Sequence, residues 1–288
     1  MSSKINRAIV FLSFLLCIIG ISCNKEEPIP SYIRIDKIDL TTNYSTEGSN
    51  SHKILDAWVY IDDNPVGTFE MPCTFPVLYA GSHNIKIFPG IKENGITETR
   101  IAYPFYDKYE TDVTLAQGQI TTIAPAVKYV QGATFQWIED FEGVAHGVCK
   151  SDGTTKDSVM TITSTSSEIF EGTGSGKVEI FGGTYFGMTC NKYSLPKSGA
   201  SVFLEMNYNC NTEFNVGVAG YTASGTLEMQ QIAITLNPTS GWNKIYINLS
   251  SEVTNATNST KFAVFFSMIK NSSLSSSYFY LDNVKLIN

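Results

Sequence analysis

The feature of this chain that most restricts its fold is a series of short runs in which apolar and polar residues alternate. In the run DAWVYI, Ala57, Val59 and Ile61 alternate with Trp58 and Tyr60. A period of two residues places alternate side chains on opposite faces of a strand, whereas an amphipathic helix needs a period of 3.6. Helical periodicity is nearly absent elsewhere, so the sequence predicts an all-β protein.

Gly, Pro, Asn and Asp separate these runs at the spacing of hairpins. Asp63-Asn64-Pro65 predicts a turn, and Gly67-Thr68-Phe69 is expected to begin the return strand. The pattern changes again at Gln131-Gly132-Ala133, where we place a domain boundary. A chain of 288 residues is long enough for two domains, which we expect at 35–130 and 131–288.

Residues 55–90 contain the order V-x-I-D-D-x-x-V-G followed by G-x-H-x-I-x-I. This order resembles small PEGA-type and carboxypeptidase-regulatory-like β-sandwich modules. Such modules are mostly spacers or docking units. The resemblance therefore implies an Ig-like or PEGA-like β-sandwich over residues 35–130, with no chemistry of its own.

The second unit opens with FQWIEDFEG and closes with YFYLDNVKLIN, and about eight strand-like runs lie between them. This frame resembles the galactose-binding-like jelly rolls found in many carbohydrate-binding modules. The matching positions are Asp140-Phe141-Glu142 and Leu281-Asp282-Asn283-Val284-Lys285-Leu286. The resemblance implies a jelly roll over residues 131–288 whose first and last strands lie side by side.

The N-terminus has the order of a signal peptide: Lys4 and Arg7, then an apolar run from Ala8 to Ile21. That run is too short to span a bilayer, which takes about 20 residues. Gly20-Ile21-Ser22-Cys23 resembles a bacterial lipobox. It implies removal of residues 1–22 and acylation of Cys23, which anchors the protein to a membrane. The alternative is an ordinary cleaved signal with an incidental cysteine.

Residues 23–34 read as a tether that Pro28 and Pro30 stiffen. Lys25, Glu26 and Glu27 resemble the lysine-plus-acidic signal of surface-exposed lipoproteins of the Bacteroidota. The resemblance implies an outer-membrane lipoprotein that faces outward from the cell. The simpler interpretation is that Glu26 and Glu27 only keep the tether solvated.

Composition excludes one class of partner. The chain has 27 acidic and 20 basic residues and a net charge of −7, without a run of Lys and Arg. A phosphate backbone needs a basic surface, so we expect no nucleic-acid binding. Charged residues make up only 16% and aromatics 12%, which is typical of an exported β protein.

Four cysteines remain once Cys17 and Cys23 are assigned to the N-terminal signal and its anchor. No CxxC motif or zinc-like spacing occurs among them. Two interpretations are equally good: one disulfide among Cys149, Cys190 and Cys210, or buried free thiols. The four residues are Cys73, Cys149, Cys190 and Cys210.

Nothing in the sequence points to an enzyme. His52, His83 and His146 are the only histidines, and neither an HExxH nor a GxSxG motif is present. A pair of glycosidase carboxylates is set by three-dimensional spacing and stays open at this point. We expect a non-catalytic protein.

Similar jelly rolls hold a structural calcium ion between oxygen ligands of the first and last strands. The resemblance assigns Glu142 and Asp282 to this role, with Asp140 as a third ligand. Calcium needs six to eight oxygens, and backbone carbonyls would supply the remainder. The alternative is that these acids are solvated strand ends.

Alternation also predicts which jelly-roll side chains face a ligand. Residues from Val202 and Phe214 onward alternate, with these two pointing inward. The opposite face then combines aromatic rings with amides and a carboxylate, which is what sugar recognition requires. An ordinary solvated sheet face explains the polar residues equally well, and Trp242 reads as a core or edge residue. The predicted ligand-binding set is Tyr185, Phe203, Glu205, Asn207, Asn215, Gln231, Phe265 and Ser267.

Asp157-Ser158-Val159 resembles the Bacteroidota acceptor for O-glycosylation, which implies a modified Ser158.

Two functions of different classes follow from these patterns. In the first, the jelly roll of a surface lipoprotein binds a glycan. In the second, the protein is a structural accessory subunit docked on an outer-membrane assembly, secretion or uptake complex. A protein-docking patch has a large apolar centre, whereas a sugar site shows a few aromatics flanked by amides.

Overall fold

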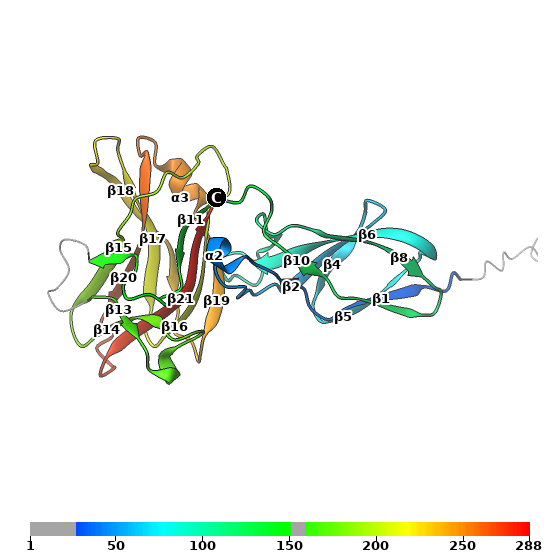
Figure 1. Ribbon diagram of the computed structural model, residues 1–288, viewed down its shortest axis with the longest axis horizontal. Helices are drawn as coiled ribbons and strands as arrows, with labels where there is room; N and C mark the ends of the chain where they lie inside the picture. Colours follow the sequence, from blue (N-terminus) through cyan, green and yellow to red (C-terminus); the bar gives the residue numbers. More distant parts are fainter. Residues whose placement is uncertain (1–26, 151–158) are drawn as a thin grey trace, which may run out of the picture.

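The computed structural model describes residues 27–150 and 159–288 and consists of two β-sandwiches (Figure 1). Each sheet is built from strands of one sandwich only, and the α-helices of the described residues, α2 and α3, are short. The all-β prediction is confirmed. Long polar-apolar alternation has thus folded as strands throughout the described residues.

The N-terminal sandwich packs a three-stranded sheet, in the order β5-β1-β9, against a five-stranded sheet. The larger sheet has the order β4-β3-β6-β7, and β8 also pairs with β6. Its elements are β1 (Ser31–Ile35), β2 (Asp39–Leu40), α2 (Tyr44–Glu47), β3 (Asp56–Ile61), β4 (Asn64–Glu70), β5 (Cys73–Val77), β6 (Gly81–Lys92), β7 (Arg100–Ala102), β8 (Tyr109–Leu115), β9 (Ile120–Ile123) and β10 (Ala126–Val127).

Alternation correctly predicts the inner face of β3, where Ala57, Val59 and Ile61 are buried. The turn that follows lies one or two residues earlier than expected. Asp62 and Asp63 both have positive φ, 49° and 64°, so they form the tight two-residue hairpin turn. The return strand β4 consequently begins at Asn64.

The predicted tether is shorter than residues 23–34. Residues 31–34 belong to β1, which pairs antiparallel with β5 and parallel with β9. Ile33 and Ile35 are fully buried in the core of the N-terminal sandwich. The two prolines just before β1 obscured this strand in the sequence, because they favour extended tethers as well as strand starts.

The C-terminal sandwich consists of a six-stranded and a five-stranded sheet. The first has the order β13-β14-β21-β16-β19, with β11 also pairing with β21, and the second has the order β12-β15-β20-β17-β18. Its elements are β11 (Phe135–Glu139), β12 (Val148–Lys150), β13 (Thr161–Thr163), η1 (Ser166–Glu168), β14 (Ser175–Ile180), β15 (Thr184–Thr189), β16 (Phe203–Cys210), β17 (Phe214–Tyr221), β18 (Leu227–Leu236), β19 (Asn243–Asn248), α3 (Ser250–Asn255), β20 (Lys261–Ile269) and β21 (Ser277–Ile287).

The first and last strands of this sandwich are neighbours, as the resemblance implied. β11 pairs antiparallel with β21, and Glu139 lies opposite Val284. The DFE tripeptide follows β11 in a turn, where Phe141 has a φ of 57° and a buried side chain. The ring of Phe141 therefore belongs to the core of this sandwich.

The cysteine pairing left open by the sequence is Cys149 with Cys190. Strands β12 and β15 pair with each other. The disulfide joins the edge strand β12 to the residue that directly follows β15. Cys73 and Cys210 are free thiols, and burial raises the pKa of Cys210 to about 11. The protein therefore has both features that the sequence left open, one disulfide and free thiols.

The two sandwiches meet in one place. The N-terminal sandwich lies against the outer face of the six-stranded sheet, and the five-stranded sheet lies on the side away from it (Figure 1). Phe203, Tyr246 and Ile287 project from the six-stranded sheet into the core of the N-terminal sandwich. The described chain begins at the far end of that sandwich, beside β1 (Figure 1).

Candidate functional site

Three predicted ligand-binding residues lie inside the interface between the sandwiches. Phe203, Glu205 and Asn207 point outward from β16, as alternation predicted, but they are only 2%, 0% and 2% exposed. The prediction that they meet a ligand is therefore wrong. Alternation decides which side of a sheet a residue faces, and a second domain covers that side here.

Glu205 is the centre of this interface. Its carboxylate accepts hydrogen bonds from the hydroxyls of Tyr103, at 2.8 Å, and Tyr129, at 3.1 Å. The ammonium of Lys244 lies 3.4 Å away. A buried charge is tolerable only when it is paired and hydrogen-bonded, so these partners hold Glu205 in place.

Lys285 is the second buried cation of the interface. It donates to the backbone carbonyl of Ser49, at 2.6 Å, and to the hydroxyl of Tyr129, at 3.1 Å. Burial lowers the pKa of Lys285 to about 8, and the nearby Glu205 carboxylate limits the shift. Burial likewise lowers the pKa of Lys244. The interface thus holds two ammonium groups around one carboxylate.

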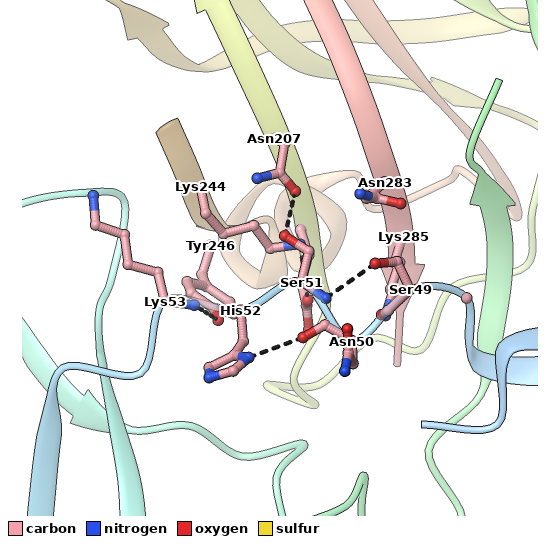
Figure 2. Close-up of polar contacts among 12 residues, drawn as sticks. Ser49, Asn50, Ser51, His52, Lys53, Asn207, Lys244, Tyr246, Asn283 and Lys285 are labelled. Carbon is pink, nitrogen blue, oxygen red and sulfur yellow. Dashed lines mark hydrogen bonds and ion pairs between the residues drawn. The ribbon is translucent and has the colours of Figure 1, made fainter. Parts of the chain in front are cut away.

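The segment 49–53 of the N-terminal sandwich lies across the same sheet (Figure 2). Ser51 donates to the side-chain oxygen of Asn207, at 2.8 Å, and the backbone N–H of Lys53 donates to the Tyr246 hydroxyl, at 2.9 Å. These contacts occupy the groups that a ligand would use. The covered residues position the two sandwiches relative to each other.

Tyr185 is a core residue, so its predicted role at a ligand site is also wrong. It is 2% exposed, and its ring packs edge-on against Phe279 at a centroid distance of 5.6 Å. Burial alone raises the pKa of its hydroxyl. The neighbouring residue, Phe186, is the one that points outward from β15.

Asn215 and Phe265 lie on the outer face of the five-stranded sheet, which the N-terminal sandwich leaves open. Phe265 stacks on Phe186 at a centroid distance of 5.1 Å and is only 1% exposed. A Cβ atom at Gly217 would collide with the Phe265 ring, so glycine lets this ring lie flat on β17. Phe265 therefore forms the apolar floor of this face rather than a free platform.

A hollow of about 480 Å³ opens beside Asn215 on the same face. Thr235 donates to the side-chain oxygen of Asn215, at 2.7 Å, and Asn215 donates to the Ser267 hydroxyl, at 3.2 Å. The exposed side chain of Ile269 supplies the apolar part. The hollow is lined by Thr212, Glu213, Asn215, Thr235, Pro238, Ile269, Lys270, Asn271 and Ser272.

Gln231 does not belong to this hollow. It lies on the edge strand β18 opposite Val218, a core position, and a bulge interrupts the register nearby. Thr235, Ile269 and Lys270 line the hollow but were missed in the sequence. Asn215 lies opposite Thr235 on one neighbouring strand and opposite Ser267 on the other. Knowledge of this register would have identified Thr235.

The three acids assigned to calcium line a second hollow, of about 280 Å³, together with Tyr44, Glu171 and Asn283. Glu142 accepts hydrogen bonds from the backbone of Thr173 and Gly174. Asp282 accepts from Ser175, at 2.6 Å, and burial raises its pKa to about 7. In the part of the chain that the structure describes, no three His, Cys, Asp or Glu side chains could together hold a metal ion.

The hydrogen bonds on these acids thus fit loop-capping acceptors better than a metal shell. Asp140 is bonded in the same way, since it accepts from the Tyr44 hydroxyl at 2.8 Å. Calcium binding stays a prediction.

Several predicted sites lie outside the described residues: Cys23, Lys25, Glu26 and Ser158. Glu27 is described and exposed. The helices of the described ranges are all too short or too polar to cross a membrane.

Comparison with known proteins found no matching family model and no matching curated protein. Solved structures do match. A CBM22-1 xylan-binding domain of Xyn10C from Paenibacillus barcinonensis is 12% identical, with a TM-score of 0.40, and the match covers 55% of this chain and 96% of that one. A family 11 carbohydrate-binding module from Clostridium thermocellum, in complex with a β-1,3-1,4-mixed-linked tetrasaccharide, is 19% identical, with a TM-score of 0.37 and the same coverage.

A further match is to carbohydrate-binding modules of the β-sandwich superfamily, with 13% identity and a TM-score of 0.38. It covers 81% of this chain and 85% of that one. These are similarities of β-sandwich architecture.

Proposed function

We propose that this protein is a non-catalytic surface lipoprotein that binds a glycan on the outer face of its five-stranded sheet. The observation that carries this proposal is the open hollow beside Asn215. Its amides, hydroxyls, single carboxylate and single ammonium can donate to and accept from sugar hydroxyls. Ligand sites combine such convergent polar groups with apolar surface, which the exposed side chain of Ile269 supplies here.

The site is also well placed for a ligand outside the cell. Acylation at Cys23 would anchor the chain next to the end of the N-terminal sandwich where the described residues begin (Figure 1). The five-stranded sheet lies on the far side of the molecule from that end. The N-terminal sandwich then acts as a rigid spacer, which agrees with the PEGA-like role that the sequence suggested.

The glycan proposal is tested by affinity electrophoresis of the full mature chain in gels that contain single soluble polysaccharides. We expect at least one polysaccharide to retard the protein, and Asn215→Ala combined with Thr235→Ala to weaken the retardation about tenfold or more, since each lost hydrogen bond contributes roughly 1 kcal/mol. Asn84→Ala, at an amide on the N-terminal sandwich that bonds Asp112, is the matched control. Unchanged retardation of the double variant would contradict the proposed site.

The anchor is tested separately in cells. Cys23→Ala is expected to release the protein from the membrane fraction. Replacement of Lys25, Glu26 and Glu27 is expected to keep the anchor and to lose only surface exposure, measured by protease treatment of intact cells. Equal membrane partitioning of Cys23→Ala and wild type would contradict the lipoprotein proposal.

The second candidate is an accessory subunit docked on an outer-membrane protein complex. One observation favours it: β18 is an edge strand whose outer side pairs with no other described strand. Leu227 and Ile232 on this strand are 48% and 50% exposed. An unprotected edge can accept a strand of another protein. A gentle detergent pull-down with a β18 edge variant, Ile232→Lys, would then lose a specific partner that the Asn215 variant keeps.

A further inference from the structure

The outer face of the six-stranded sheet is only partly covered by the N-terminal sandwich. Beyond Asn207 and Lys244, its outward side chains belong to β14, β21 and β16, and they include Tyr278, Tyr280 and Asn209. Tyr278 and Asn209 are partly exposed. We define this region as the open half of the face. It consists of Lys177, Glu179, Asn209, Trp242, Tyr278 and Tyr280, together with Phe170 from a neighbouring loop.

Four aromatic rings form a continuous row across the open half. Tyr278 and Tyr280 have centroids 4.9 Å apart, and Tyr280 lies 6.2 Å from Trp242. Trp242 in turn lies 5.5 Å from Phe170, whose side chain is 38% exposed. Tyr280 is nearly buried, so it joins the more exposed rings at the two ends of the row.

Polar groups alternate with these rings in the strand register. Lys177 lies opposite Tyr280, and Glu179 lies opposite Tyr278, on the neighbouring strand β14. On the other side, Asn209 lies opposite Tyr280. Glu179, Lys177 and Glu168 are linked by ion pairs at 3.1 Å and 2.8 Å. The two tyrosines of the row therefore have a charged or amide neighbour within one strand spacing.

One hydrogen-bond donor of the row, on Trp242, lacks a partner in the described part of the chain. The indole N–H of Trp242 is buried and has no hydrogen-bond partner among the described residues. A donor in this state costs free energy unless water or a ligand accepts its hydrogen bond. A ligand that carries both hydroxyls and apolar C–H surface would cover the rings and bring hydroxyl acceptors next to Trp242.

We propose that the open half is a second glycan-binding surface, on which pyranose rings of a polysaccharide stack along the row from Phe170 to Tyr278. Protein-docking patches have an apolar centre depleted of charge. Here Lys177, Glu168 and Glu179 lie among the rings, which suits a ligand with alternating apolar and hydroxyl surfaces. The inference shares the ligand class of the proposed function but uses separate residues on the opposite sheet.

The test uses the full mature chain and affinity electrophoresis against single soluble polysaccharides, among them a xylan and a mixed-linkage β-glucan. The strip variant is Phe170→Ala with Tyr278→Ala, and the matched control is Tyr60→Ala, which removes a partly exposed ring from the N-terminal sandwich. We expect the strip variant to bind at least one polysaccharide about tenfold more weakly, the size expected for aromatic contacts. Unaltered circular dichroism and melting temperature would show that it folds.

The two glycan surfaces are separated by combining variants. Asn215→Ala with Thr235→Ala is expected to leave residual retardation that disappears when the strip variant is added. In the Asn215→Ala, Thr235→Ala variant, the same polysaccharide should reduce acrylamide quenching of the Trp242 fluorescence. The contribution of Trp242 is obtained by comparison with a Trp242→Phe variant. Wild-type retardation of the strip variant on every polysaccharide would overturn the inference. The inference would also be overturned if none of the polysaccharides retarded the wild-type protein. The same holds if the strip variant lost a protein partner while its retardation stayed unchanged.

Discussion

The covered and open halves of the outer face of the six-stranded sheet share strands β16 and β21 but carry different residues. We define the covered half as Phe203, Glu205, Lys244, Tyr246, Lys285 and Ile287. It buries one carboxylate and two ammonium groups beneath tyrosines of the other sandwich. The open half carries ion pairs as well, but those of Lys177 remain partly exposed to solvent.

This difference shows that polarity along a strand does not reveal whether a face is free. Glu205 and Glu179 are both outward acids on strands of one sheet, yet the first is fully buried and the second is 28% exposed in its side chain. A buried ion pair depends on every partner, because removal of one leaves an uncompensated charge. A partly exposed pair keeps water as an alternative partner.

The largest expected effect is therefore that of Glu205→Ala. It leaves Lys244 and Lys285 buried without their carboxylate, which we expect to cost about 3–5 kcal/mol in the free energy of unfolding. Glu179→Ala in the open half is the matched control and is expected to cost less than about 1 kcal/mol. Urea unfolding, followed by circular dichroism and tryptophan fluorescence, measures both. Equal losses for the two variants would mean that the halves do not differ energetically.

The second prediction concerns Asp282, which lies opposite Asn207 at the boundary between the halves. If calcium joins Asp282, Glu142 and Asp140, the metal-stripped full chain should melt roughly 4–12 °C higher in calcium than in chelator, the shift for a ligand at about 100 times its Kd. Asp282→Ala should abolish that difference. Identical melting curves with and without chelator would assign these acids to loop capping alone.

Sequence patterns predicted the side of the sheet for most residues but not what covers it. Val59 and Phe203 both follow strict alternation, and only three-dimensional contact shows that Phe203 packs into the other sandwich. Bulges add a second limit. The register shifts between β17 and β18 move Gln231 away from Asn215, and no residue type in β18 announces them.

The position of the hollow was only half visible in the sequence. Asn215 was recognised, but Lys270 and Asn271 belong to a loop after β20 whose approach depends on how the sheet curls. The aromatic row was missed for a similar reason. Tyr278 and Trp242 are separated by 36 positions, and Trp242 alone looks like a core residue.

The third prediction is a pH dependence that only the covered half should produce. Burial lowers the pKa of Lys285 in the folded protein to about 8, from the ordinary lysine value of 10.5. The unfolded chain then binds more protons between these values, so stability is expected to rise with pH from about 8. Glu205, Lys244, Glu47 and Glu171 are the other charges that act on it.

Urea unfolding between pH 7.5 and 9.5 measures this rise, which we expect to be on the order of 1–2 kcal/mol at 1.36 kcal/mol per pKa unit. Lys285→Met removes this titrating group and should reduce the rise, leaving the part that comes from Lys244, whose pKa burial also lowers. The buried tyrosines, whose raised pKa values oppose the rise at higher pH, set the upper end of the window. A profile that is unchanged in Lys285→Met would assign the dependence to other groups.

The smallest expected effect belongs to the open half. Lys177 pairs with Glu168 at 2.8 Å, and the side chains of both remain about one-fifth exposed. A double-mutant cycle of Lys177→Ala and Glu168→Ala should therefore give a coupling free energy of about 0.2–1 kcal/mol. The same cycle on Lys244 and Glu205 should give a clearly larger value, because neither partner has water to replace the other. If the open pair couples as strongly as the buried one, then Lys177 and Glu168 are held as rigidly as the interface. The row of rings beside them would then be a rigidly packed layer that could not adjust to a ligand.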